Sequence, residues 1–170
     1  DTVFVPRWRT HGVVMPALVD VLVPAAVKLH VRVSSKRQLF NEVAGAAARA
    51  ASLDYKAVLA ALSEREHLGS TGVGEGVAMP HARVEGLDQL VALFWLLDQP
   101  IAFDAIDDKP VDLVFVLLVP AGAETVHLKT LAKVARKLRD PNLRSQLRST
   151  DDPKVAWRAL TANGSRNEAA

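Results

Sequence analysis

The sequence contains no cysteine in its 170 residues. This absence excludes disulfide bonds, thiolate catalysis, Fe–S clusters and cysteine-ligated zinc sites, and it fits a reducing cytoplasm. The sequence also lacks a long hydrophobic run. The longest ones, Leu90–Leu97 and Leu113–Val119, have the length of strands and fall far short of the roughly 20 residues of a membrane-spanning helix. We therefore expect a cytoplasmic protein without membrane insertion.

Charge of one sign is not in large excess either. Lys and Arg number 21 and Asp and Glu number 19, and the resulting net charge of +2 is too small to indicate a nucleic-acid partner. The hydrophobic share of 49% and the charged share of 24% are typical of a globular chain, and the length suits one domain. We expect this domain over residues 15–162, because Met15 is a suitable start. An extension over residues 1–14 precedes it, and a polar tail over residues 163–170 follows it.

The first half of the chain predicts one strand and two helices. Apolar residues alternate with polar ones over residues 27–33, which is the period of a half-buried strand. Ser35 then begins a capping box that Gln38 completes, and an alanine-rich helix follows to about residue 51. A second helix is predicted from Asp54, and Gly69 is placed to end it as a left-handed cap.

The second half predicts two mostly apolar, central strands and three more helices. The strands cover residues 89–97 and 111–119 with a connection over 100–110, and the helices cover about residues 125–139, 141–148 and 152–161. Strands and helices in this order predict one α/β domain with a mixed sheet between helices.

His81 is the first candidate for a functional side chain because a glycine-rich loop over residues 70–76 precedes it. Backbone N–H groups of such a loop can approach an anion closely, because no Cβ intervenes. Arg65 lies on the core-facing stripe of the preceding helix, from which its planar guanidinium can lean toward a phosphate. The candidate phosphate-binding residues of the loop are Ser70, Thr71, Gly72 and Gly74. The same pattern also fits a surface turn with an incidental histidine.

His127 is the second candidate, in the first turn of a helix that directly follows a central strand. Ligands of open α/β sheets collect at such junctions, and free N–H groups there attract anions. The same position also suits an exposed helix residue. The histidines predicted at solvated or rim positions are His11, His30 and His67. The aromatic residues predicted in the core are Tyr55, Trp95 and Trp157.

Other chemistries lack their motifs. A zinc site needs three or four clustered ligands, and no third ligand joins His81 and His127, so neither a metal nor another cofactor is expected. The glycine-rich loop has neither the Gly-Lys-Ser/Thr of a nucleotide-binding loop nor the helix of a dinucleotide fingerprint after it, and no Gly-x-Ser-x-Gly elbow is present. A series of basic residues over 133–148 fits a nucleic-acid stripe or, more often, a solvated helix face.

Two segments carry a more specific pattern than any of these motifs. The first is Glu-Arg-Glu-His-Leu-Gly-Ser-Thr-Gly-Val-Gly-Glu-Gly-Val-Ala-Met-Pro-His over residues 64–81. The second is Pro-Ile-Ala-Phe-Asp-Ala-Ile-Asp over residues 100–107, which continues to His127 and Leu128. Together they closely resemble the enzyme IIA domains of the bacterial phosphotransferase system, in the mannitol/fructose class. The resemblance spans about residues 22–160, and the Arg-Glu-x-x-Gly-Ser-Thr-Gly-x-Gly form indicates the nitrogen-regulatory branch.

The resemblance implies a mixed, roughly five-stranded sheet flanked by helices, and a phosphoryl carrier without a cofactor. It implies that His81 accepts the phosphoryl group from a histidine phosphocarrier (HPr or its nitrogen-branch counterpart), that His127 hydrogen-bonds the phosphoryl oxygens, and that Arg65 neutralises them. It also implies an output through regulatory protein targets, such as a kinase or a transporter.

Two alternatives remain open. One is a freestanding fructose- or mannitol-type enzyme IIA that donates phosphate to the IIB domain of a sugar transporter. The other is a regulatory binding module that is no longer phosphorylated. The only hint toward this second alternative is Ala82, at a position where members of the family usually have glycine.

Overall fold

The computed structural model describes residues 17–122 and 124–162. The expected extension over residues 1–14, the expected tail over residues 163–170 and the predicted position of His11 lie outside these ranges. Within the described ranges, no helix is both long enough and apolar enough to cross a membrane.

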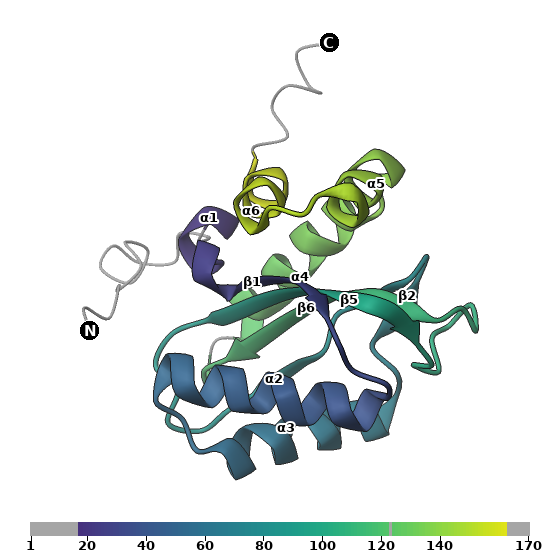
Figure 1. Ribbon diagram of the computed structural model, residues 1–170. Coiled ribbons are helices and arrows are strands. Elements are labelled where there is room, and N and C mark those ends of the chain that lie inside the picture. The colour runs from purple at the N-terminus through teal and green to yellow at the C-terminus, as the bar shows by residue number, and fades with distance from the viewer. Residues whose placement is uncertain (1–16, 123, 163–170) are drawn as a thin grey trace.

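A mixed sheet of six strands forms the centre of the molecule (Figure 1). Its strands are β1 (Val27–Val31), β2 (Gly72–Gly74), β3 (Val77–Ala78), β4 (His81–Arg83), β5 (Val91–Ile101) and β6 (Val111–Val119). They lie in the order β1-β5-β6-β3-β2, and β4 pairs with β6 on the side that β3 also uses. The β5–β6 and β2–β3 pairs are antiparallel, and the others are parallel.

The predicted α/β domain with a mixed sheet and two central apolar strands is therefore confirmed. The expected strand count of roughly five becomes six, because the segment from residue 70 to residue 83 forms more structure than a loop and one extended stretch. It contains the three short strands β2, β3 and β4, of which β2 and β3 form a hairpin around Glu75 and Gly76.

Helices cover both faces of the sheet. They are α1 (Leu18–Val21), α2 (Lys36–Ala51), α3 (Tyr55–Leu68), α4 (Glu124–Leu138), α5 (Pro141–Ser149) and α6 (Pro153–Thr161), and a 3₁₀ turn, η2, spans Pro24–Ala26. Helices α2 and α3 lie on one side of the sheet, and α1, α4, α5 and α6 lie on the other (Figure 1).

The helix ends show how local sequence sets the boundaries. Ser35 accepts a hydrogen bond from the N–H of Gln38 at 3.1 Å, and the side chain of Gln38 returns to the N–H of Ser34 at 2.8 Å. Asp54 caps α3 as predicted. The predicted left-handed cap at Gly69 is wrong, because Gly69 has a φ of 163°, which is extended backbone that leads the chain from α3 toward β2.

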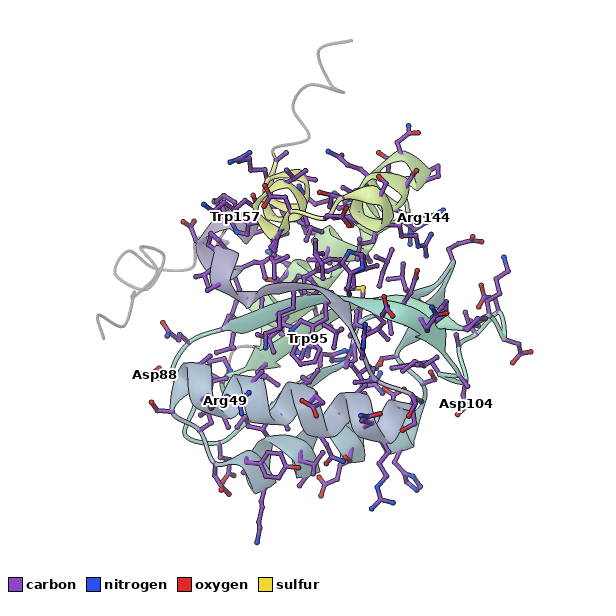
Figure 2. All side chains as sticks on the ribbon, in the orientation of Figure 1. Arg49, Asp88, Trp95, Asp104, Arg144 and Trp157 are labelled. Carbon is purple, nitrogen blue, oxygen red and sulfur yellow. The ribbon has the colours of Figure 1, made fainter. Side chains whose placement is uncertain are left out.

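The core is centred on β5 and β6. Val111 and the run Leu113–Val119 are at most 1% exposed, because helices cover both faces of this part of the sheet. Trp95 is 2% exposed, as predicted. Trp157 on α6 is half-buried (Figure 2), and its Nε1–H donates to the carbonyl of Leu22.

The prediction of a buried Tyr55 is wrong. Its side chain is 39% exposed in the first turn of α3, and its hydroxyl donates to Oδ1 of Asn41 on α2 at 2.9 Å. The phenol thus provides a polar link between α2 and α3.

Candidate active site

His81 is the first residue of β4, in a stretch of strand that a proline interrupts. Ala78 of β3 pairs with Val114 of β6, and His81 pairs with Leu117, so the register is unchanged across Pro80. Pro80 has no N–H to donate, but its carbonyl accepts from the N–H of Leu117 at 3.0 Å. The most buried strand therefore fixes the backbone of His81, while its side chain lies half-exposed at an edge of the sheet.

The ring of His81 is held in one tautomer. Its Nδ1 lies 2.9 Å from the carbonyl oxygen of Met79. Because a carbonyl oxygen can only accept, Nδ1 carries the proton and Nε2 keeps the lone pair. Burial lowers the pKa of His81 below 6.5, and the nearby charge of Arg65 lowers it further, while the Met79 carbonyl and the carboxylate of Glu66 act in the opposite direction. The neutral, nucleophilic imidazole is therefore favoured at neutral pH.

The structure brings His127 and Arg65 to the same place. His127 lies in the first turn of α4, and the centre of its ring is 5.0 Å from that of His81, with the two planes inclined by 59°. Arg65 lies in the last turn of α3, and its Nη1 donates to the carbonyl of Gly69 at 2.9 Å. A nucleophilic imidazole, a second imidazole and a guanidinium form a cluster suited to a small tetrahedral anion.

The glycine-rich segment precedes the strand of His81, but the hydroxyls of Ser70 and Thr71 and the N–H groups of Thr71 and Gly72 already have protein partners. The hydroxyl of Ser70 donates to the carbonyl of Phe103 at 2.8 Å, and the N–H of Gly72 donates to that same hydroxyl oxygen at 3.1 Å. Both the N–H and the hydroxyl of Thr71 donate to the carboxylate of Glu66. Binding of a phosphate by these groups would require an exchange of hydrogen bonds.

The two glycines of β2 have different reasons to lack a side chain. A Cβ at Gly72 would lie 2.7 Å from the Cβ of Ala105, so this glycine permits a close approach of the connection after β5. Gly74 has a φ of +104°, a conformation that L residues rarely adopt, and it lies beside the carboxylate of Asp107. Gly74 is therefore close to negative charge and farther along the hairpin than the Thr71–Met79 hydrogen bond.

Glu66 is a residue of this region that sequence reasoning missed. Its side chain is only 7% exposed, and its Oε1 accepts from Nζ of Lys36 at 2.8 Å and from the N–H of Thr71 at 3.0 Å. The carbonyl of Thr71 accepts from the N–H of Met79 at 3.0 Å, and the carbonyl of Met79 holds His81. A continuous chain of hydrogen bonds thus links α2 to the ring of His81. No local pattern predicts it, because Lys36 and Glu66 are 30 residues apart.

Ala82 stands where the resemblance leads us to expect glycine. Ala82 is 5% exposed, so its methyl group faces the core of the domain instead of the surface that a partner would contact. The position of Ala82 therefore gives no steric reason for a loss of partner binding.

Two basic residues of α5, Arg144 and Arg148, make contacts within the fold. Arg144 donates to the carbonyls of Leu138 and Arg139, and Arg148 pairs with Asp112 at 2.9 Å. These contacts interrupt a continuous basic stripe. In the described part of the chain, no three His, Asp or Glu side chains are grouped closely enough to hold a metal ion.

Two imidazoles and a guanidinium thus lie together at an edge of the mixed sheet of this α/β protein, and comparison with known proteins gives its family. A family model described as "Phosphoenolpyruvate-dependent sugar phosphotransferase system, EIIA 2" matches residues 20–163. The chain belongs to this family.

Individual relatives agree with this assignment. The chain is 42% identical over 143 residues to a nitrogen regulatory protein of Bradyrhizobium diazoefficiens, an alignment that covers 84% of this chain and 94% of the relative. The crystal structure of the nitrogen regulatory protein IIA-Ntr from Neisseria meningitidis superposes with a TM-score of 0.81 at 39% identity, over 84% of this chain and 97% of that one. The IIA mannitol structure from Escherichia coli shares the fold, with a TM-score of 0.71 at 18% identity over 82% of this chain and 98% of that one.

Proposed function

We propose that the protein accepts a phosphoryl group on Nε2 of His81 from a histidine phosphocarrier that resembles HPr. The observation that carries this proposal is the contact between Nδ1 of His81 and the Met79 carbonyl, because it leaves the lone pair on Nε2. Nε2 attacks the phosphorus, the N–P bond of the carrier breaks, and its electron pair returns to the imidazole of the carrier. Such a transfer depends mainly on alignment and charge stabilisation.

The neighbours of His81 suit this step. The guanidinium of Arg65 supplies positive charge, and the second imidazole of His127 supplies a hydrogen-bonding group for the phosphoryl oxygens. The assignment of Ser70, Thr71, Gly72 and Gly74 as phosphate-binding residues stays a prediction, since it needs the exchange of hydrogen bonds described above.

Exposed apolar side chains near the site give a protein partner something to contact. Leu128 follows His127 directly and is 66% exposed, and Leu68 ends α3 three residues after Arg65 and is 85% exposed. Ile106, on the connection after β5, is 84% exposed, and its backbone N–H donates to the carbonyl of Gly72. Exposed apolar groups around a reactive side chain are typical of a surface that docks another protein.

The proposed output is regulatory. The relatives named nitrogen regulatory protein and IIA-Ntr indicate the nitrogen branch, in which the phosphorylation state of His81 would control contacts with a kinase or a transporter in the cytoplasm. A sugar-branch protein would instead pass the phosphoryl group to a IIB domain.

The test is the intact mass of the protein after incubation with phosphoenolpyruvate, enzyme I and the phosphocarrier. We expect the gain of one acid-labile phosphoryl group, its loss in His81→Ala, and its retention in the control His30→Ala, which changes an exposed histidine on β1. Label on folded His81→Ala would contradict the assignment of the nucleophile. Onward transfer to a IIB domain would support the sugar branch, and no label on the folded wild type would leave a binding module.

A further inference from the structure

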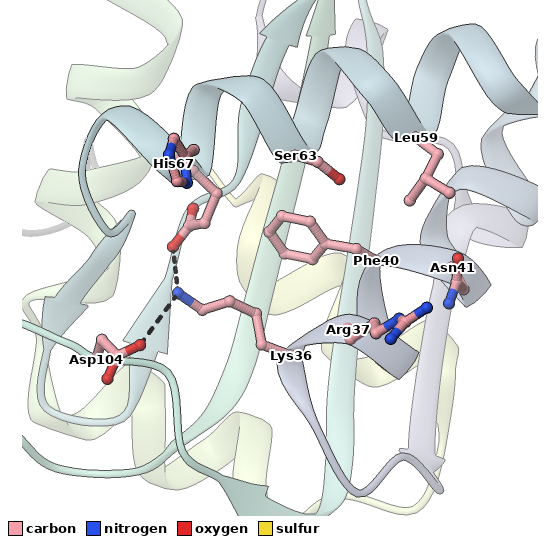
Figure 3. A pocket seen from close by; sticks show the side chains of 9 residues that line it. Lys36, Arg37, Phe40, Asn41, Leu59, Ser63, His67 and Asp104 are labelled. Carbon is pink, nitrogen blue, oxygen red and sulfur yellow. Dashed lines mark hydrogen bonds and ion pairs between the residues drawn. The ribbon is translucent and has the colours of Figure 1, made fainter.

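A hollow lies between α2 and α3, and Glu66 is one of the residues that line it. It is a pocket of about 500 Å³ (Figure 3). Its lining comes from one stripe of each helix and from the connection after β5: Lys36, Arg37, Phe40, Asn41, Leu59, Ser63, Glu66, His67 and Asp104. Pockets of this size are large enough for a small organic molecule.

The base of the pocket is apolar and its rim offers mainly hydrogen-bond donors. Phe40, which is 5% exposed, and Leu59 form the apolar part. The side chains of Arg37, Ser63 and His67 have no hydrogen bond or ion pair with any residue in the described ranges. Such a combination of an apolar base with unused donors is typical of a site for a ligand that has an apolar body and an anionic head.

The charges of the pocket limit the head group to a single negative charge. Lys36 is already paired with Glu66 at 2.8 Å and lies 3.9 Å from Asp104, so the two carboxylates border one end of the pocket. Figure 3 shows Arg37 and Asn41 at the other end, with Phe40 between the two ends. The Oδ1 of Asn41 accepts from Tyr55, which leaves its amide N–H groups as donors beside Arg37. A carboxylate at this end meets a free guanidinium, whereas a dianionic phosphate would be repelled more strongly by Glu66 and Asp104.

The pocket is connected to the candidate active site through hydrogen bonds. Glu66 lines the pocket and also holds Thr71, which is bound to Met79, whose carbonyl fixes the ring of His81. A ligand whose carboxylate binds Arg37 and whose apolar body extends past Phe40 would reach Lys36, and displacement of Lys36 from Glu66 would loosen the first contact of this chain. A change in the orientation of His81 would then follow.

We propose that the α2–α3 pocket binds a small organic monocarboxylate with an aromatic or branched aliphatic body, and that its occupancy alters phosphoryl acceptance at His81. The binding site stands on the pocket itself, and the effect on His81 rests on the proposed function. By linkage, the factor by which the ligand changes the equilibrium constant for phosphorylation of His81 equals the factor by which phosphorylation changes the dissociation constant of the ligand.

The binding test is a titration of the ¹⁵N-labelled full chain with 3-phenylpropanoate, followed by the shifts of its amide resonances. We expect saturable shifts confined to residues 36–41, 59–67 and 104, weakening of about tenfold in Arg37→Gln, and no weakening in the matched control Arg158→Gln on α6. The neutral amide 3-phenylpropanamide should bind correspondingly more weakly, and phenyl phosphate should not bind better than the carboxylate.

Three results would overturn the binding site: no saturation up to about 10 mM, equal affinity for the amide, or shifts that map to His81 and His127 instead of the pocket. The coupling is tested separately, by the initial rate of phosphoryl transfer with and without saturating 3-phenylpropanoate in wild type and in Arg37→Gln. The coupling is supported if the ligand changes the transfer rate of the wild type and if Arg37→Gln needs a higher ligand concentration for the same change. Equal wild-type rates with and without ligand overturn it. A protein that binds the probe but takes no phosphoryl group would refute the proposed function and not the pocket.

Discussion

His81 stands between two regions that are held by different forces. The first, which we call the scaffold, is β4 paired with β6 over residues 81–83 and 117–119. Its β6 partners are at most 1% exposed, and apolar burial holds it in place. The second, which we call the strap, is the glycine-rich segment over residues 70–76. It is held by polar contacts, most of which join it to chain segments that are distant in sequence.

The contacts of the strap are few and specific. Beyond those of Ser70 and Thr71, the N–H of Glu75 donates to Asp107 at 2.9 Å, and the carbonyl of Glu75 accepts from Arg148 on α5 at 2.9 Å. Apolar burial contributes a large free energy that tolerates small displacements, whereas each hydrogen bond contributes about 1 kcal/mol and depends on geometry. We infer that substitutions in the scaffold mainly change the free energy of unfolding of the domain, and that substitutions in the strap mainly change the rate of phosphoryl transfer.

The largest expected effect on stability comes from the scaffold. Phe115 is fully buried on β6, and Phe115→Ala should lower the free energy of unfolding by about 3–5 kcal/mol through lost burial and a cavity. Chemical denaturation measures this loss. The rate of phosphoryl transfer per folded molecule should stay unchanged, and a large fall in that rate at full folding would break the division between the two regions.

A smaller loss of stability is expected from overpacking the strap. Gly72→Ala places a Cβ 2.7 Å from the Cβ of Ala105 and 2.9 Å from its Cα, so the strap or the connection after β5 must move. The cost is about 1–3 kcal/mol, and the transfer rate should fall with it. The control is Gly69→Ala, where nothing lies within 4 Å and the backbone is extended. Equal behaviour of the two variants would show that the close approach at Gly72 has no consequence.

The difference between the regions also explains what could be predicted from the sequence. The strand over residues 111–119 was predicted with the boundaries that the structure shows, because a continuous apolar run has one stable location in an α/β fold. The helix starts after Ser35 and Asp54 were predicted from local capping groups. His81, His127 and Arg65 were singled out by their places relative to such elements, and the structure brings them together.

The strap could not be predicted in the same way, because its structure depends on partners elsewhere in the chain. Ser70 is bound 33 residues away at Phe103, and the carbonyl of Glu75 is bound 73 residues away at Arg148. The glycine-rich pattern indicated a loop and anion binding, but it contains no information about which acceptors the hydroxyl groups bind. Gly69 was misjudged for a related reason, since the strand that follows α3 determines its backbone.

Removing the charge that anchors the strap should affect transfer more than stability. Glu66→Gln keeps an oxygen for Thr71 but loses the ion pair with Lys36, which is itself 24% exposed and can turn toward solvent. We expect a loss of about 1–2 kcal/mol in stability and a clear fall in the transfer rate. The matched control is Glu64→Gln, an exposed carboxylate two residues earlier on α3. If Glu66→Gln and Glu64→Gln transfer the phosphoryl group at equal rates, the strap does not help to position His81.

The smallest expected effect is the pH dependence that His81 itself contributes. Because burial lowers the pKa of His81 in the folded state below 6.5, the unfolded state binds more protons than the folded state between the two values. Stability therefore falls as the pH falls through 6.5, and the loss levels off below the folded pKa. The variant His81→Gln should lack this component, so its free energy of unfolding should decline less than that of wild type over the same window. A ring titration of His81 by NMR gives the folded midpoint directly. A midpoint at or above 6.5 would mean that the Met79 carbonyl and Glu66 outweigh burial in setting the charge of the nucleophile.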